Sequence, residues 1–243
     1  MSSPPPAQPS PLRPLAQQRS LREQITAALR DEMMTGRLPA GTRFTVKEIA
    51  DLYGVSATPV REALVDLTSQ ALLWMEHNRG YRVPLFTWEH YAEIVDARSL
   101  VTDGFFGRLR SGAQRVDLST LPAIRRRAQD AQRAARAGQL DILVGCDRRF
   151  WLSLGELLGN RRLTDYLDWL RVQYWIFAAP YLRGRADIAR YCWDRHLELV
   201  DRLEARDAAG VQELLRTYNQ ESLEQMAALC GAPVVPPQRT VED

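Results

Sequence analysis

The 243-residue chain lacks long hydrophobic runs and contains few cysteines, histidines and lysines. No segment approaches the ~18 consecutive apolar residues of a membrane-spanning helix, and the proline-rich N-terminus has no apolar segment typical of a secretory signal. The three cysteines, Cys146, Cys192 and Cys230, are too few and too scattered for a disulfide framework or a paired-cysteine zinc site. These absences predict a cytoplasmic protein that does not associate with membranes.

Charge of one sign is not in excess either, because 32 basic residues are balanced by 30 acidic ones. Residues 1–85 contain 10 basic and 8 acidic residues, and residues 86–243 contain 22 of each. An architectural DNA-binding protein would need a large positive excess to neutralise phosphates. The composition therefore disfavours that class of protein.

Proline is unevenly distributed along the chain. Six of the 14 prolines fall in the first 14 residues, so we predict that residues 1–17 form a disordered arm that folding does not require. Residues 231–243 are predicted to be a disordered tail. Between residues 85 and 232 only Pro122 and Pro180 interrupt the chain, which is typical of helical structure.

Residues 18–85 carry the pattern of three helices followed by a hairpin. Capping-box patterns open predicted helices over 20–35 and 46–53, and Ser56 starts a third that ends near residue 70. The last two helices are short and joined by a glycine-containing turn, which predicts a helix-turn-helix. Two extended runs with turn residues between them, at 72–76 and 80–84, complete a winged helix.

Residues 88–230 are predicted to form a second, all-helical domain after a hinge at about 85–88. Glycines and one proline divide this region into expected helices at 88–110, 118–137, 140–158, 160–179, 186–206 and 208–229. The predicted fold class is therefore mainly α. It comprises an N-terminal winged helix-turn-helix with a small β-hairpin, followed by an all-α bundle of six or seven helices.

The second helix of a helix-turn-helix enters the DNA major groove with its N-terminal residues near the base edges. Ser56 and Thr58 are short hydroxyl donors there, and Arg61 can reach a phosphate or, bidentately, a guanine edge. Further candidates flank the preceding helix or lie at the wing tip: Arg43, Thr45, Lys47, Arg79 and Gly80. The spacing of these residues does not by itself indicate DNA binding. It is equally consistent with Arg61 as a solvated surface charge and Ser56 as a simple helix cap.

The segment LPAGTRFTVKEIADLYGVSATPVREAL at 38–64, followed by NRGYRV at 78–83, resembles the winged helix of GntR-family bacterial transcription regulators. The helical remainder is similar to the effector-binding domain of the FadR subgroup. The resemblance implies a homodimer that binds a near-palindromic DNA operator and responds to a small-molecule effector, with repression relieved by the ligand as the commoner mode. Ala57 and Lys47 stand where arginine is common in the family, so operator preference does not carry over.

Many members of this subgroup bind a divalent metal through an Asp, a His four residues later and two further His. Here Asp147 and His196 match the Asp and one His, but Trp151 and Tyr218 occupy the other two positions. Two protein ligands are too few for a stable site, so we expect no metal and no other cofactor, with Asp147 and His196 as residual candidates. Cys192 precedes His196 by four residues and is an alternative ligand, although a buried thiol is favoured.

The resemblance also implies that an organic ligand enters the bundle. Arg98 matches an arginine that in this subgroup tends to face the pocket, where it either pairs with Asp147 or binds an effector carboxylate. A structural salt bridge fits Arg98 equally well. Trp151 either fills the former metal cavity or forms a flat wall for the ligand. The candidate effector site comprises Arg98, Asp147, Trp151, His196 and Tyr218, and the expected effector is a carboxylate.

The alternative function is a metal-dependent protein or enzyme in a helical bundle with an accessory DNA module. That function requires a complete set of metal ligands and a general base, and the sequence shows neither a glycine-rich phosphate loop nor a nucleophile elbow. We therefore expect a repressor of a metabolic or catabolic operon rather than an enzyme.

Overall fold

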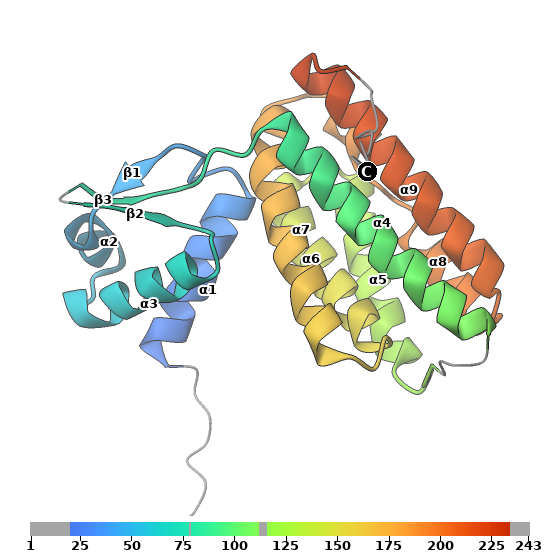
Figure 1. Ribbon diagram of the computed structural model, residues 1–243. Coiled ribbons are helices and arrows are strands. Elements are labelled where there is room, and N and C mark those ends of the chain that lie inside the picture. Colours follow the sequence, from blue (N-terminus) through green and yellow to red (C-terminus); the bar gives the residue numbers. More distant parts are fainter. Residues whose placement is uncertain (1–19, 78, 112–115, 234–243) are drawn as a thin grey trace, which may run out of the picture.

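The computed structural model describes residues 20–77, 79–111 and 116–233, which form a small winged-helix part beside a larger helical bundle (Figure 1). The predicted arm at 1–17 lies outside the described residues, and of the predicted tail only residues 231–233 are described. Among the described helices, none is long and apolar enough to cross a membrane. The mainly α fold class is confirmed.

The winged-helix part contains α1 (Leu21–Met34), β1 (Arg43–Phe44), α2 (Val46–Tyr53), α3 (Ala57–Ser69), β2 (Trp74–Glu76) and β3 (Gly80–Arg82). Both predicted capping boxes form, at Ser20 before α1 and at Thr45 before α2. Gly54, in the left-handed conformation at φ 64°, ends α2 and starts the turn into α3. Ser56 precedes α3, but its side chain makes no capping hydrogen bond.

The wing is a three-stranded antiparallel sheet in the order β1-β3-β2 rather than the predicted two-stranded hairpin. The two residues of β1 are too few to show a pattern of alternating burial, and Arg43 and Phe44 pair with Arg82 and Tyr81 of β3. The predicted first strand also starts too early. Residues 72 and 73 are leucines with 1% exposure each, and they pack into the core before the strand begins.

The bundle contains α4 (Trp88–Arg110), α5 (Leu121–Arg136), α6 (Leu140–Glu156), α7 (Arg161–Leu182), the 3-10 helix η1 (Ile188–Tyr191), α8 (His196–Glu204) and α9 (Ala208–Cys230). The long helices α4 and α9 run side by side, and α7 faces the winged-helix part (Figure 1). The predicted helix over 186–206 is wrong: the chain forms η1, then an extended stretch, then α8. Trp193 lies in that stretch and packs against Tyr218 at 4.8 Å between ring centroids, so aromatic burial overrides helix propensity.

The predicted end of α7 before Pro180 is also wrong, because the helix continues to Leu182. A proline in the last turn of a helix removes one backbone donor and keeps helical φ, and Pro180 is exposed there. The amide of Arg183 donates to the carbonyl of Ala179 and closes the helix beyond the proline.

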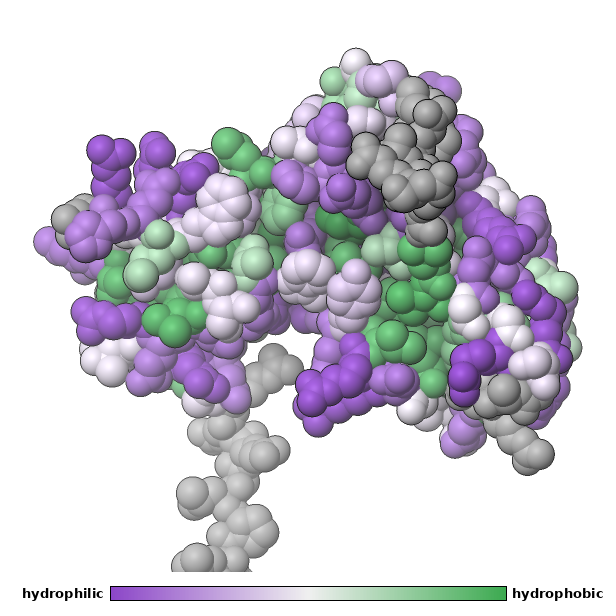
Figure 2. Space-filling model, in the orientation of Figure 1, coloured by the Kyte–Doolittle hydropathy of each residue, from purple (hydrophilic) through white to green (hydrophobic). Residues whose placement is uncertain are grey.

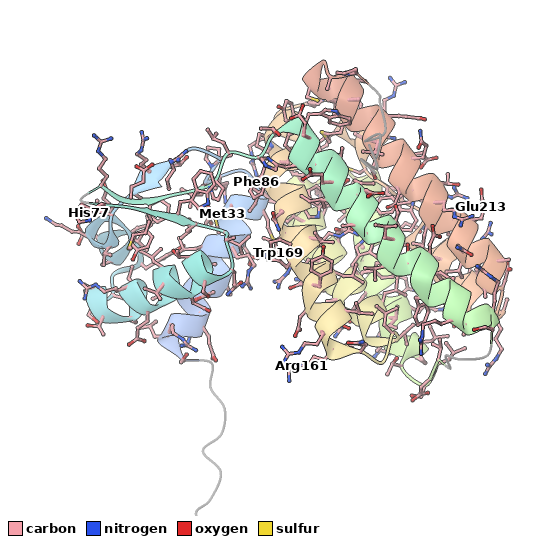
Figure 3. All side chains as sticks on the ribbon, in the orientation of Figure 1. Met33, His77, Phe86, Arg161, Trp169 and Glu213 are labelled. Carbon is pink, nitrogen blue, oxygen red and sulfur yellow. The ribbon has the colours of Figure 1, made fainter. Side chains whose placement is uncertain are left out.

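Helix α7 joins the two parts of the molecule. The indole Nε1 of Trp169 donates to the backbone carbonyl of Gln70, just after α3, at 2.7 Å, and the guanidinium of Arg183 donates to the carbonyl of Thr35, just after α1. Met33 and Trp169 lie where α1 meets α7 (Figure 3). Buried residues of α1, α3, α6 and α7 belong to one continuous apolar core, which packs the winged helix directly against α7.

Candidate DNA interface and effector cavity

The N-terminal end of α3 is available for DNA. Helix α3 buries one face through Val60, Ala63, Leu64 and Leu67, while Ser56, Thr58 and Arg61 are exposed. Within the described part of the chain, the Arg61 side chain has no hydrogen-bond or ion-pair partner. A guanidinium left unpaired on an exposed recognition-helix face is suited to contact a phosphate or a guanine.

Of the other predicted DNA-binding residues, some already form hydrogen bonds within the protein, and others are exposed to solvent. Arg43 donates from Nε to Glu76 at 2.8 Å, and Arg82 donates to the other oxygen of the same carboxylate at 2.6 Å. The hydrogen bond from Arg43 holds the pKa of Glu76 below its ordinary value. The Thr45 hydroxyl accepts from the Glu48 amide and caps α2. Lys47 is exposed, as is Arg79 at the wing turn, so these two side chains can contact phosphates without first breaking an ion pair.

Gly80 has a structural role in the wing. Its φ is +86°, and a Cβ atom placed on it would lie 2.4 Å from the carbonyl oxygen of Phe44. Only glycine allows β3 to approach β1 so closely at this backbone angle. Gly80 therefore fixes the wing turn that presents Arg79.

In the bundle, Asp147 of α6 is the centre of a buried polar cluster, with 4% exposure. Its two oxygens accept from the indole Nε1 atoms of Trp151 at 2.8 Å and Trp175 at 2.7 Å. Arg171 Nη1 lies 3.6 Å from one carboxylate oxygen, which is an ionic contact rather than a hydrogen bond, and His196 Nε2 lies 3.6 Å from the other oxygen. Burial acts to raise the pKa of Asp147, but Arg171 and His196 outweigh it, so the pKa lies below its ordinary value.

Arg171 of α7 was missed by the sequence analysis. It is 3% exposed, it donates to the Tyr218 hydroxyl at 2.5 Å, and its guanidinium carbon lies 4.5 Å from the centre of a Trp151 ring. Burial acts to lower the pKa of Arg171, and Tyr218 and Asp147 more than offset it, so the pKa is raised. The available signal was its place inside LRVQYWIFAA at 170–179, where a single charge in an apolar run requires a buried partner.

Arg98 of α4 does not pair with Asp147, so one of the alternatives for this residue is wrong: Arg171 lies beside the carboxylate, at 3.6 Å. Arg98 is 6% exposed, donates from Nη2 to the Asn219 side-chain oxygen at 2.7 Å, and lies 3.5 Å from the Tyr218 hydroxyl. Its Nε has no hydrogen-bond partner, and no carboxylate of the described residues lies within 4.0 Å of the guanidinium. Arg98 is thus a buried cation without a counter-ion.

A cavity of about 650 Å³ opens on these side chains between α4, α6, α7 and α9. Arg98, Arg171, Asn219 and the stacked rings of Trp151 and Tyr218, whose centroids are 5.3 Å apart, line its polar end. Its apolar lining includes Phe105, Phe106, Leu109, Leu154, Leu157 and Leu215. This volume is typical of a pocket for a small organic molecule, roughly 300–1,000 Å³.

The predicted effector residues are therefore brought together but do not share one role. Arg98, Trp151 and Tyr218 line the cavity, whereas Asp147 and His196 do not. Asp147 holds Trp151 in place through the indole hydrogen bond. His196 is 1% exposed, and neither ring nitrogen has a hydrogen-bond partner among the described residues.

These residues do not fit a divalent metal. Both oxygens of Asp147 are engaged by indole donors, and the Arg171 cation, 3.6 Å from the carboxylate, would repel a metal ion. Burial raises the pKa of the Cys192 thiol to about 12, which disfavours a thiolate ligand. Over the described ranges, no three His, Cys, Asp or Glu side chains are grouped so that they would hold a metal.

The chain matches two family models: "Bacterial regulatory proteins, gntR family" over residues 21–83 and "FCD domain" over residues 107–221. It is 25% identical to the HTH-type transcriptional regulator McbR of Escherichia coli K12 over 84% of this chain and 91% of McbR. It is 27% identical to a probable D-xylose utilization operon transcriptional repressor of Paenarthrobacter nicotinovorans, over 78% of this chain and 83% of that protein.

Two solved structures share the fold. The structure of E. coli McbR/YncC superposes with a TM-score of 0.72 at 23% identity, over 88% of this chain and 99% of that one. A putative GntR transcriptional regulator from Rhodococcus sp. RHA1 gives a TM-score of 0.67 at 23% identity, over 87% and 98% of the two chains.

Proposed function

The chain belongs to the GntR family of bacterial regulators, with an FCD domain after its winged helix. We propose that it is a repressor and that binding of an organic acid lowers its affinity for DNA. The regulator class follows from the family, and the relatives are HTH-type transcriptional regulators and repressors. The operator contacts, the effector and the sign of the response are our proposal.

The unpaired Arg61 on the exposed face of α3 carries the DNA part of the proposal. Ser56 and Thr58, one turn earlier, add hydroxyl donors to the same end of the helix. Lys47 and Arg79 provide phosphate contacts beside them, whereas Arg43 must first exchange its ion pair with Glu76. We assign base or phosphate recognition to the first three residues and backbone positioning to the others.

Replacing Arg61 with alanine tests this assignment. A duplex selected from a random-sequence pool serves as the operator, and its affinity is measured by fluorescence anisotropy at fixed salt. Arg61→Ala is expected to weaken binding by about 1–3 kcal/mol without changing thermal stability. Arg161→Ala is the charge-matched control, because this side chain is 93% exposed on α7, at the end of the bundle (Figure 3). Equal losses in both variants would contradict the recognition-helix assignment.

The unpaired, buried Arg98 carries the effector part of the proposal. A guanidinium removed from water without a counter-ion is costly, and an incoming carboxylate would relieve that cost through charge-assisted hydrogen bonds. The cavity leads directly to this side chain. We therefore infer that the effector carboxylate binds Arg98 against the wall formed by Trp151 and Tyr218.

A homodimer completes the proposal, because two winged helices related by a two-fold axis would read a near-palindromic operator. Hydrophobic residues gather on the bundle face that α4 crosses (Figure 2). Leu100 of α4 is 51% exposed. Covering this patch with a second copy would remove apolar surface from water.

Helix α7 provides a direct route from the cavity to the DNA-binding part. Trp169 and Arg171 are two residues apart on α7, so their side chains point to opposite sides of the helix. One contacts the end of α3, and the other lines the cavity. A ligand that binds Arg98 and presses on the Trp151 and Tyr218 wall, which Arg171 contacts through the Tyr218 hydroxyl, would therefore shift the helix on which the winged helix rests.

A further inference from the structure

The polar end of the cavity carries more positive than negative charge. Arg98 and Arg171 contribute two buried cations, and Asp147 contributes the single buried carboxylate, at 3.6 Å from Arg171. These three side chains leave a surplus of one positive charge. Because Asp147 lies beside Arg171 and not beside Arg98, the surplus is located on Arg98.

The carboxylates elsewhere in the lining do not cancel this surplus. Asp168 forms a bidentate pair with Arg148, with its shorter contact at 2.6 Å. Asp207 is 48% exposed and lies 3.9 Å from Arg202. Each acidic side chain of the lining therefore already faces an arginine other than Arg98.

We propose that Arg171 is the fixed internal counter-ion of Asp147 and that Arg98 selects a ligand with one negative charge and a large apolar body, namely a medium-chain or aromatic monocarboxylate. This inference rests on the proposed effector function and specifies its ligand class. The Asp147–Arg171 pair holds the wall residues Trp151 and Tyr218 through hydrogen bonds. No metal ion takes part in binding.

The lining and the volume of the cavity favour a ligand with a large apolar part. Away from Arg98, the lining is dominated by phenylalanine and leucine side chains of α4, α6 and α9. A short hydroxy acid would neutralise Arg98 but leave most of the roughly 650 Å³ unfilled. Arg202 and Arg206 also line the cavity, but Arg202 pairs with Glu198 at 2.8 Å and Arg206 is exposed to solvent. The second charge of a dicarboxylate would therefore meet the apolar lining without a buried arginine beside it, at a large desolvation cost. A neutral compound of the same length would leave Arg98 unpaired.

Calorimetric titration of the full-length protein in EDTA tests the proposal with three matched probes: decanoate, 1-decanol and decanedioate. Decanoate is expected to bind about 10- to 100-fold more tightly than either of the others, the range that corresponds to a charge-assisted hydrogen bond. Equal affinity for decanoate and decanol, preference for decanedioate, or a requirement for added metal would overturn the proposal.

Variants that change or restore the net charge of the cavity show whether Arg98 acts on the ligand or only stabilises the fold. Arg98→Gln removes the surplus positive charge of the cavity. The ratio of the affinities for decanoate and decanol should then fall to about 3 or less. The double variant Arg98→Gln with Asp147→Asn also removes the counter-ion of Arg171, so that Arg171 can pair with the ligand carboxylate. Decanoate should then again bind about 10-fold more tightly than decanol. The variant Arg98→Lys keeps the charge and should retain a weakened preference, which keeps the test informative if the glutamine variant unfolds. Undiminished preference in Arg98→Gln would contradict the assignment.

The same experiment distinguishes this inference from the proposed function. If none of the three probes binds while the protein still binds its selected operator, the ligand class is wrong and the DNA-binding role stands. If the operator does not bind but decanoate does, the cavity assignment stands and the repressor proposal fails.

Discussion

At the scale of single residues, the bundle is organised by buried charge. Asp147 lies in a site where desolvation alone would favour its neutral form, yet the guanidinium of Arg171, the neighbouring His196 and the indole donor of Trp175 keep its pKa low. Arg98 donates to Asn219 and Tyr218, but no carboxylate of the described residues lies within ion-pair distance of it. The charge of Asp147 is therefore compensated within the protein, whereas we propose that a ligand compensates the charge of Arg98.

The first prediction concerns the pH dependence of Asp147. A group whose folded-state pKa is depressed stabilises the fold above its unfolded-state pKa of about 3.9, and this contribution is lost as the pH falls through the folded-state value. Asp147→Asn should therefore cost about 3 kcal/mol of unfolding free energy at pH 7, and the gap should narrow as the pH falls below about 4. Urea denaturation measures both values.

The control for this experiment is Asp141→Asn. Asp141 also pairs with an arginine, Arg183, but its side chain is 49% exposed, so screening should limit its loss to about 1 kcal/mol or less at pH 7. A difference between the wild type and Asp147→Asn that stays constant from pH 7 to pH 3 would show that the carboxylate charge does not stabilise the fold.

The second prediction is that the purified protein carries no stoichiometric divalent metal at Asp147 and His196. Two of the four expected ligand positions are Trp151 and Tyr218, and Arg171 places a positive charge beside the carboxylate. Elemental analysis by mass spectrometry is the direct check. About one zinc, nickel or manganese ion per chain, lost on His196→Ala, would contradict the charge arrangement described above.

Individual residues were predictable where their role is local. The two capping boxes and the glycine that ends α2 follow from short-range chemistry that the sequence displays. The partner of Asp147 was not predictable in this way. Arg171 contacts Asp147 from a different helix, and the family motif indicates Arg98 instead.

At the scale of elements, α7 has three functions at once. Its faces contribute Arg171 to the cavity, Trp175 to Asp147 and Trp169 to the end of α3. All residues from 170 to 179 are buried. A helix enclosed on all sides moves as a unit, because its neighbours leave no free volume for local rearrangement.

The third prediction follows from this contact. Trp169→Phe keeps an aromatic ring but removes the donor to the Gln70 carbonyl, which should cost about 1 kcal/mol. Amides in the last turn of α3 should then exchange hydrogen faster, as measured by mass spectrometry. Tyr166→Phe is the control, since Tyr166 stacks on Trp169 at 5.8 Å but its hydroxyl has no partner among the described residues. Unchanged exchange in Trp169→Phe would show that this hydrogen bond does not hold α3.

Most helices of the bundle were predictable from periodicity and breaker residues, to within a few residues at their ends. The region 186–206 was not, because its conformation depends on tertiary contacts. Trp193 leaves the helical path and packs against Trp151 and Tyr218, which lie about 40 residues earlier and 25 residues later in the chain. No local pattern encodes that contact.

At the scale of the whole molecule, the winged helix shares one apolar core with α7 and the neighbouring part of the bundle, while a second core that includes Phe106 and Phe150 lies within the bundle. Figure 1 shows α7 facing the winged helix. The order of the two parts was predictable from the motif at 38–64 and the helical pattern after residue 88. Their contact was not, since it depends on Trp169, Arg183 and the ends of α1 and α3 meeting in space. In our proposal, this contact couples occupancy of the cavity to DNA binding.

The most direct test of the account is operator affinity measured with and without saturating decanoate, for the wild type and for Arg98→Gln, at one salt concentration. The account predicts that decanoate weakens operator binding by the wild type about 5- to 150-fold, corresponding to a coupling of about 1–3 kcal/mol, and leaves Arg98→Gln unaffected. Operator affinity of the wild type that is the same in both conditions, while calorimetry shows decanoate bound, would contradict the account.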